Sequence, residues 1–145
     1  MLSRIRKIFS RAGGKENKGP AQRILVVDDD ETTCTLIRSV LTRKGYEVTV
    51  AYDGEKGYDI AVMDRPDLIF LDCMLPGILG VDLGKKLKEN ETTRGIPIFF
   101  LTSLNTPKNV IDCYDAGADH YLVKPISPNE LINHVRMSLE NPELS

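Results

Sequence analysis

Two kinds of segment alternate along the chain: short apolar runs, and longer segments whose apolar residues recur at helical spacing. Short runs of apolar and β-branched residues fall at 24–27, 47–51, 68–71, 96–101 and 121–123. Segments with helical periodicity fall at 31–44, 54–64, 81–89, 106–117 and 129–139. An unbroken apolar run is typical of a strand that is covered on both faces. Five repeats of strand and then helix predict an α/β fold, a doubly wound five-stranded parallel sheet with helices on both faces.

Polar side chains stand directly after four of these predicted strands. They are Asp28, Asp29 and Asp30 after the first, Asp72 after the third, Thr102 and Ser103 after the fourth, and Lys124 and Pro125 after the fifth. In a parallel α/β fold, ligands bind at the carboxyl ends of the strands. We therefore expect carboxylates, a hydroxyl and an ammonium group to meet at one edge of the sheet. Asp30 taken alone is better explained as the N-cap of the helix that follows.

The clustered carboxylates predict a bound cation, because their mutual repulsion would otherwise push at least one of them toward its neutral form. An oxygen-rich site of this kind suits Mg²⁺, which prefers octahedral oxygen ligands and keeps several waters. A carboxylate on the metal can attack a phosphoryl group, while the metal and Lys124 neutralise charge on the transferring oxygens. Thr102 can hydrogen-bond a phosphoryl oxygen. The residues by themselves thus indicate phosphoryl-transfer chemistry.

Four segments resemble, in the right order, the receiver domains of two-component response regulators. They are ILVVDDD at 24–30, DLIFLDCMLPG at 67–77, FLTS at 100–103 and AGADHYLVKP at 116–125. Four separate motifs make the resemblance specific, and it covers residues 21–141. It implies a flavodoxin-like receiver fold with strand order 2-1-3-4-5 and five helices. It also implies a single-domain, chemotaxis-type response regulator.

By this resemblance Asp72 is the phosphoacceptor, phosphorylated by a partner histidine kinase or phosphotransfer protein with Mg²⁺ as cofactor. Asp29, Asp72 and the backbone carbonyl of Met74 would bind the metal, and Asp28 would act on it through a water molecule. The domain would assist its own phosphorylation and dephosphorylation, as a signalling switch and not an enzyme. Met74 and Leu104 occupy the positions that flank the phosphoryl group in this family. Both are apolar and cannot orient a water, which predicts slow loss of the phosphoryl group.

The same resemblance assigns a switch. Thr102 and Tyr121 match the family's switch pair, Lys124 matches its phosphate-binding lysine, and the bond from Lys124 to Pro125 is expected to be cis. Phosphorylation would draw Thr102 toward the phosphoryl group and let Tyr121 turn inward. The surface of the helix from Thr106 to Gly117, the fifth strand and the last helix would then change, so a downstream protein is expected to bind there.

Charge is distributed unevenly along the chain. The total is −2, but residues 1–20 carry six basic residues against Glu16, a balance of +5 that leaves −7 for the remainder. Apolar residues fall at helical spacing within this basic stretch, which predicts an amphipathic helix that binds an anionic membrane surface or a partner groove through residues 2–12. A disordered basic tail is the alternative. The predicted organisation is a basic leader at 1–12, a flexible linker at 13–20, the receiver domain at 21–141 and a tail at 142–145.

Other features limit the function and the location. Cys34, Cys73 and Cys113 have no paired or metal-type spacing, and the sequence has no signal peptide. We therefore expect a cytoplasmic protein, peripheral to the membrane if its leader binds there, in which the thiols serve packing. His120 and His134 are expected to be structural and apart from one another. The acidic body predicts protein contacts and no nucleic-acid binding.

Two other interpretations stay open. The domain can be a phosphorelay intermediate that passes its phosphoryl group to a histidine protein. It can also be a scaffold of this fold that works without phosphorylation and is anchored by its basic leader. A haloacid dehalogenase-type hydrolase is excluded, because it needs a second aspartate where Met74 stands. A glycine-rich nucleotide-binding loop is excluded by the three aspartates after the first strand.

Overall fold

The computed structural model describes residues 19–103 and 106–140. The predicted leader at 1–12, the linker up to residue 18, the tail at 142–145 and Leu104 lie outside these described residues. Within the described part of the chain, no helix is long and apolar enough to cross a membrane.

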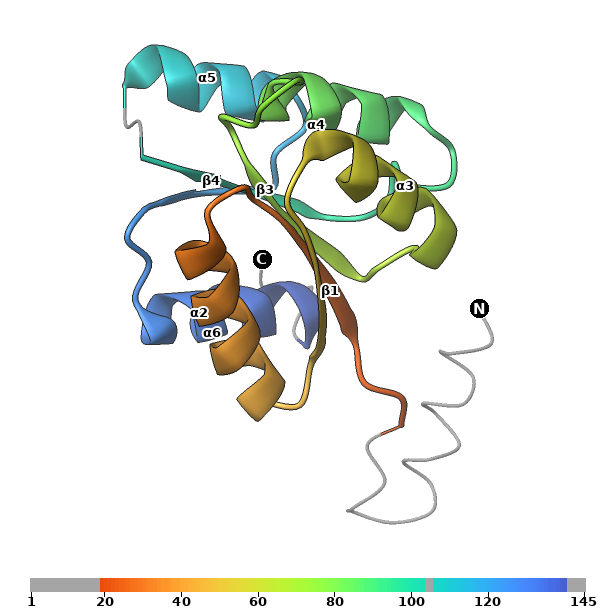
Figure 1. Ribbon diagram of the computed structural model, residues 1–145, viewed down its shortest axis with the longest axis vertical. Helices are drawn as coiled ribbons and strands as arrows, with labels where there is room; N and C mark the ends of the chain where they lie inside the picture. The colour runs from red at the N-terminus through yellow and green to blue at the C-terminus, as the bar shows by residue number, and fades with distance from the viewer. Residues whose placement is uncertain (1–18, 104–105, 141–145) are drawn as a thin grey trace.

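Strands and helices alternate throughout the described part of the chain (Figure 1). In order they are β1 (Arg23–Val27), α2 (Glu31–Arg43), β2 (Glu47–Ala51), α3 (Gly54–Asp64), β3 (Leu68–Asp72), α4 (Gly80–Glu89), β4 (Ile98–Thr102), α5 (Pro107–Asp115), β5 (His120–Val123) and α6 (Pro128–Leu139). All neighbouring strands pair in parallel, in the order β2-β1-β3-β4-β5. The predicted fold class and strand order are confirmed.

The sheet has a separate apolar core on each face. Successive residues of a strand point to opposite faces, so Leu25 and Phe100 belong to one core while Val26 and Phe99 belong to the other. Figure 1 shows α3, α4 and α5 on one side of the sheet and α2 and α6 on the opposite side. β3 and β4 are buried along their whole length, as their unbroken apolar runs predicted.

Capping side chains fix where two helices begin beside the strand ends. Asp30 is the N-cap of α2 and accepts a hydrogen bond from the backbone N–H of Thr32 at 3.1 Å. Thr106 is the N-cap of α5 and accepts from the backbone N–H of Asn109 at 3.2 Å. The predicted N-cap at Asp30 is confirmed, and each of the two caps satisfies a helix donor that has no partner within the helix.

Two pairs of side chains are in contact that the spacing in the sequence did not predict. The rings of His120 and His134 lie 5.1 Å apart, so the expectation that they are separated is wrong. They meet because β5 and α6 both pack on Phe99, whose ring is in edge contact with each imidazole. Cys73 and Cys113 are buried free thiols, as a packing role predicts, yet their sulfur atoms lie only 3.1 Å apart.

Candidate functional site

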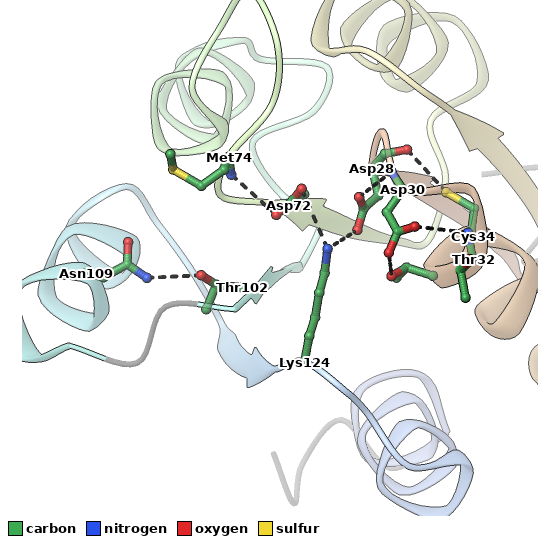
Figure 2. A network of polar contacts seen from close by, with 10 residues as sticks. Asp28, Asp30, Thr32, Cys34, Asp72, Met74, Thr102, Asn109 and Lys124 are labelled. Carbon is green, nitrogen blue, oxygen red and sulfur yellow. Dashed lines mark hydrogen bonds and ion pairs between the residues drawn. The ribbon is translucent and has the colours of Figure 1, made fainter.

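Parallel pairing brings the polar residues that follow the strands to one edge of the sheet. Val27 is level with Leu71, and Thr102 is level with Val123. The residues that follow Val27, Leu71 and Val123 are Asp28, Asp72 and Lys124. Together with Thr102 they gather at the carboxyl ends of four adjacent strands, as Figure 2 shows. The expected convergence of carboxylates, a hydroxyl and an ammonium group at this edge is confirmed.

Three aspartates form an acidic cluster at this edge. Asp28 has no exposed surface, Asp72 is 6% exposed, and Asp29 is exposed to solvent. Local backbone groups orient the two buried carboxylates: Oδ1 of Asp28 accepts from the N–H of Asp30 at 2.9 Å, and Oδ1 of Asp72 accepts from the N–H of Met74 at 3.3 Å. One oxygen from each of the three aspartates lies within 4.8 Å of the others.

Lys124 supplies the positive charge of the site. Its ammonium group lies 2.7 Å from Oδ2 of Asp28 and 3.7 Å from Oδ2 of Asp72. Oδ2 of Asp28 is enclosed, and within the described part of the chain its one recorded polar interaction is the ion pair with this ammonium. Burial by itself lowers the Lys124 pKa, but the bond to Asp28 and the charges of the nearby aspartates outweigh it and raise the pKa above its usual value. Lys124 is therefore held in its charged form beside both carboxylates.

The carboxyl group of Asp72 is destabilised as an anion when no cation is bound. Burial, followed by repulsion from the Asp28 carboxylate, raises the pKa of Asp72 to about 6, and the charge of Lys124 limits this rise. A nearby divalent cation would reverse the balance, because it favours the ionised carboxylate. The environment of Asp72 is thus one that a cation would complete.

The acidic cluster fits Mg²⁺. Its donors are carboxylate oxygens from Asp28, Asp29 and Asp72, which are the ligands this ion prefers. Mg²⁺ binds oxygen at about 2.1 Å and keeps several waters, so one ion between these aspartates can bind some oxygens directly and reach others through water. The exposure of Asp29 leaves one side of the cluster open to solvent.

A second group of polar residues lies on the other side of Asp72. Thr102 ends β4 and is buried, whereas Tyr121 on β5 is partly buried. The side-chain nitrogen of Asn109, in the first turn of α5, lies 3.4 Å from the Thr102 hydroxyl and 3.4 Å from the Tyr121 hydroxyl. Sequence reasoning missed Asn109, although its place three residues after the N-cap Thr106 puts it on the turn of α5 nearest the strand ends.

The loop after Asp72 packs tightly against the site. A Cβ atom on Gly80 would lie 1.9 Å from the backbone oxygen of Asp72, so only glycine fits there. The N–H of Gly80 donates to the carbonyl of Cys73 at 2.9 Å and closes this loop. Within the loop, Met74 is 55% exposed. On the opposite side of the site, Lys124 and Pro125 are joined by a cis peptide bond, as expected.

The family model of the response regulator receiver domain matches residues 24–136. Among curated proteins, the chain is 40% identical over 121 residues to the DNA-binding dual master transcriptional regulator RpaA of Synechocystis, covering 83% of this chain and 50% of that protein. It is 40% identical over 116 residues to the phosphate regulon transcriptional regulatory protein PhoB of Pseudomonas aeruginosa, covering 80% and 51%. The chain spans about half the length of these two relatives.

Solved structures show the same fold. A CheY-like response regulator receiver domain protein from Methanospirillum hungatei superimposes with a TM-score of 0.79 at 28% identity, covering 85% of this chain and 97% of that one. A putative response regulator from Chloroflexus aurantiacus gives a TM-score of 0.77 at 36% identity, covering 80% and 95%. The chain therefore belongs to the response regulator receiver domain family, whose members are phosphorylation-based signalling switches and not classical enzymes.

Proposed function

We propose that Asp72 accepts a phosphoryl group from a histidine kinase or a phosphotransfer protein, with Mg²⁺ bound beside it, and that this switches a protein-binding surface. One observation supports the proposal most strongly. Asp72 ends the central strand β3, and its carboxylate lies 3.7 Å from the Lys124 ammonium and within 4.8 Å of oxygens of Asp28 and Asp29. A carboxylate nucleophile, a cation site and a fixed positive charge are what phosphoryl transfer to a side chain needs.

Each group at the sheet edge has a defined task in this proposal. Asp29, Asp72 and the backbone carbonyl of Met74 would hold Mg²⁺, and Asp28 would act on it through water. The metal neutralises charge on the transferring oxygens when it is bound. An oxygen of Asp72 attacks the phosphorus atom, and the bond from phosphorus to the donor breaks as the new bond forms. Because Asp28 holds the Lys124 ammonium in place, that charge is already positioned for the phosphoryl oxygens and needs no reorganisation.

The proposed switch begins at Thr102. The Thr102 hydroxyl donates a hydrogen bond to a phosphoryl oxygen, and Tyr121 turns into the space that Thr102 leaves. Both residues border α5, so the surface formed by α5, β5 and α6 changes. A downstream protein that prefers the altered surface binds it, and the phosphoryl group biases an equilibrium between two arrangements.

A further part of the proposal concerns whether the downstream partner of the described domain is a protein or a nucleic acid. RpaA is named as a DNA-binding regulator, but the chain spans 50% of that protein. For the domain described here we propose a protein partner, because the sequence from residue 21 onward carries a net negative charge, which opposes contact with phosphate backbones.

Intact-mass spectrometry after incubation with acetyl phosphate and Mg²⁺ tests the proposal. The protein as it stands and an Asp64→Asn variant, altered at an exposed aspartate at the end of α3, are expected to gain one phosphoryl group. The Asp72→Asn variant is expected to gain none. Uptake by Asp72→Asn, or failure of all three proteins with both acetyl phosphate and a phosphorylated histidine kinase, would contradict the proposal and favour a scaffold that works without phosphorylation.

A further inference from the structure

Asn109 connects the two residues of the proposed switch. Its side-chain nitrogen lies 3.4 Å from the Thr102 hydroxyl, a contact drawn in Figure 2, and 3.4 Å from the Tyr121 hydroxyl. A carboxamide nitrogen carries two N–H groups, so it can donate one hydrogen bond to each hydroxyl. One side chain on α5 therefore bridges the end of β4 and the middle of β5.

The bridge is well placed but weak. The backbone of Asn109 is fixed, because its N–H donates to the N-cap side chain of Thr106 at 3.2 Å. Both side-chain contacts, at 3.4 Å, are longer than typical N–H···O hydrogen bonds. A shift of Thr102 by a few tenths of an ångström away from α5 would therefore take one of them out of range. The contact can oppose a movement of Thr102 without preventing it.

We propose that Asn109 is a positioning residue that holds Thr102 and Tyr121 in the unphosphorylated arrangement and so opposes the switch. The inference rests on the proposed function, in which a phosphoryl group on Asp72 draws Thr102 toward itself. That movement lengthens the contact between Asn109 and Thr102 and loosens the hold on Tyr121. The first turn of α5 then becomes free to adjust together with Tyr121.

The proposal predicts in which direction the loss of the Asn109 side chain changes the affinity for a ligand that prefers the switched arrangement. Removing the amide takes away contacts that only the unphosphorylated arrangement makes, so the switched arrangement becomes easier to reach. Any ligand that prefers the switched arrangement must then bind more tightly. If the Asn109 side chain only filled space between α5 and the sheet, its removal would instead lower stability and leave that affinity unchanged or weaker.

Affinity for beryllofluoride, a phosphoryl analogue that binds without covalent transfer, provides the test in the presence of Mg²⁺, with fluorine NMR as the readout. Asn109→Leu and Asn109→Ala are both expected to bind it about fivefold more tightly than the unaltered protein, the effect of roughly one net hydrogen bond. Asp115→Asn, at an exposed position at the end of the same helix, is the matched control and is expected to leave the affinity unchanged.

A double-mutant cycle separates positioning from a structural role. In a Tyr121→Phe background, one of the two hydroxyls that Asn109 holds is missing, so the gain from Asn109→Leu is expected to shrink. Unchanged or weaker affinity in both Asn109 variants, or an equal gain in the two backgrounds, would overturn the inference while leaving the proposed function intact. Failure of the unaltered protein to bind beryllofluoride would overturn the proposed function and this inference with it.

Discussion

The ammonium group of Lys124 lies 2.7 Å from Oδ2 of Asp28, a carboxylate with no exposed surface. The side chain of Lys124 is itself only 16% exposed, so both charges are largely removed from water. Breaking such a pair leaves an uncompensated buried charge, which is strongly destabilising even where the intact pair adds little net stability. Removing the Lys124 charge that faces Asp72 is therefore expected to destabilise the fold as well as alter the site.

Replacing Lys124 with methionine is expected to lower the free energy of unfolding by about 3 kcal/mol in metal-free buffer, because Asp28 keeps its burial and loses its counter-charge. Lys108→Met is the control. Its pair with Asp112 is nearly as short, at 3.0 Å against 2.7 Å, but the two side chains are 86% and 45% exposed. Its loss should cost no more than about 0.5 kcal/mol. Urea denaturation measures both, and equal costs would contradict the account.

Gly80→Ala is expected to lower the free energy of unfolding by about 1–3 kcal/mol and to slow phosphoryl uptake. The added Cβ would meet the backbone oxygen of Asp72 at 1.9 Å, so the strand end that carries Asp72 must move. Gly95→Ala is the matched control, because a Cβ there meets nothing within 4 Å. Chemical denaturation and the rate of uptake from acetyl phosphate check both variants, and similar behaviour of the two would refute the tight packing behind Asp72.

Loss of the phosphoryl group is expected to be slow, because Met74 has no polar atom that could orient an attacking water. Met74 is 55% exposed and lies two residues after Asp72, so a substituted polar side chain could reach the same space. Met74→Asn should therefore speed hydrolysis several-fold relative to Met74→Leu. Phosphoprotein followed over time by intact mass gives the rates. A phosphoryl-group half-life of seconds in the unaltered protein would contradict this prediction.

Acid should destabilise the domain partly through His134. Burial, followed by the charge of His120, lowers the His134 pKa below its usual 6.5, while Glu130 opposes the shift. Below pH 6.5 the unfolded chain binds more protons at this position than the folded one, so this contribution to stability is present at higher pH and is lost as the pH falls. The drop in unfolding free energy on acidification should be smaller in His134→Gln. An identical drop in both proteins would refute this role of His134.

The arrangement of the sheet could be predicted from the sequence because burial is encoded locally. Strands β3 and β4 are covered on both faces, and that leaves unbroken apolar runs. The boundaries were less certain, because turns compete with strands at their ends. The fourth strand begins at Ile98 and not at Ile96, since the N–H of Ile96 donates to the carbonyl of Thr93 in a turn.

Contacts between side chains from distant elements could not be predicted in the same way. Asp28, Asp72 and Lys124 were placed together because the carboxyl ends of parallel strands share one edge. The meeting of Cys73 with Cys113 has no such rule behind it. It depends on how α5 packs over the sheet, and spacing in the sequence does not contain that information.

The most direct test of the central claim is to locate the phosphoryl group. Protein treated with acetyl phosphate would be reduced with borohydride, which converts an aspartyl phosphate to homoserine, and then mapped by peptide mass spectrometry, with and without Mg²⁺. The account predicts homoserine at position 72 only, in samples that contained Mg²⁺. Homoserine at another aspartate, or equal conversion of Asp72 in the presence of a chelator, would contradict the assignment of this acidic cluster as a magnesium-dependent phosphorylation site.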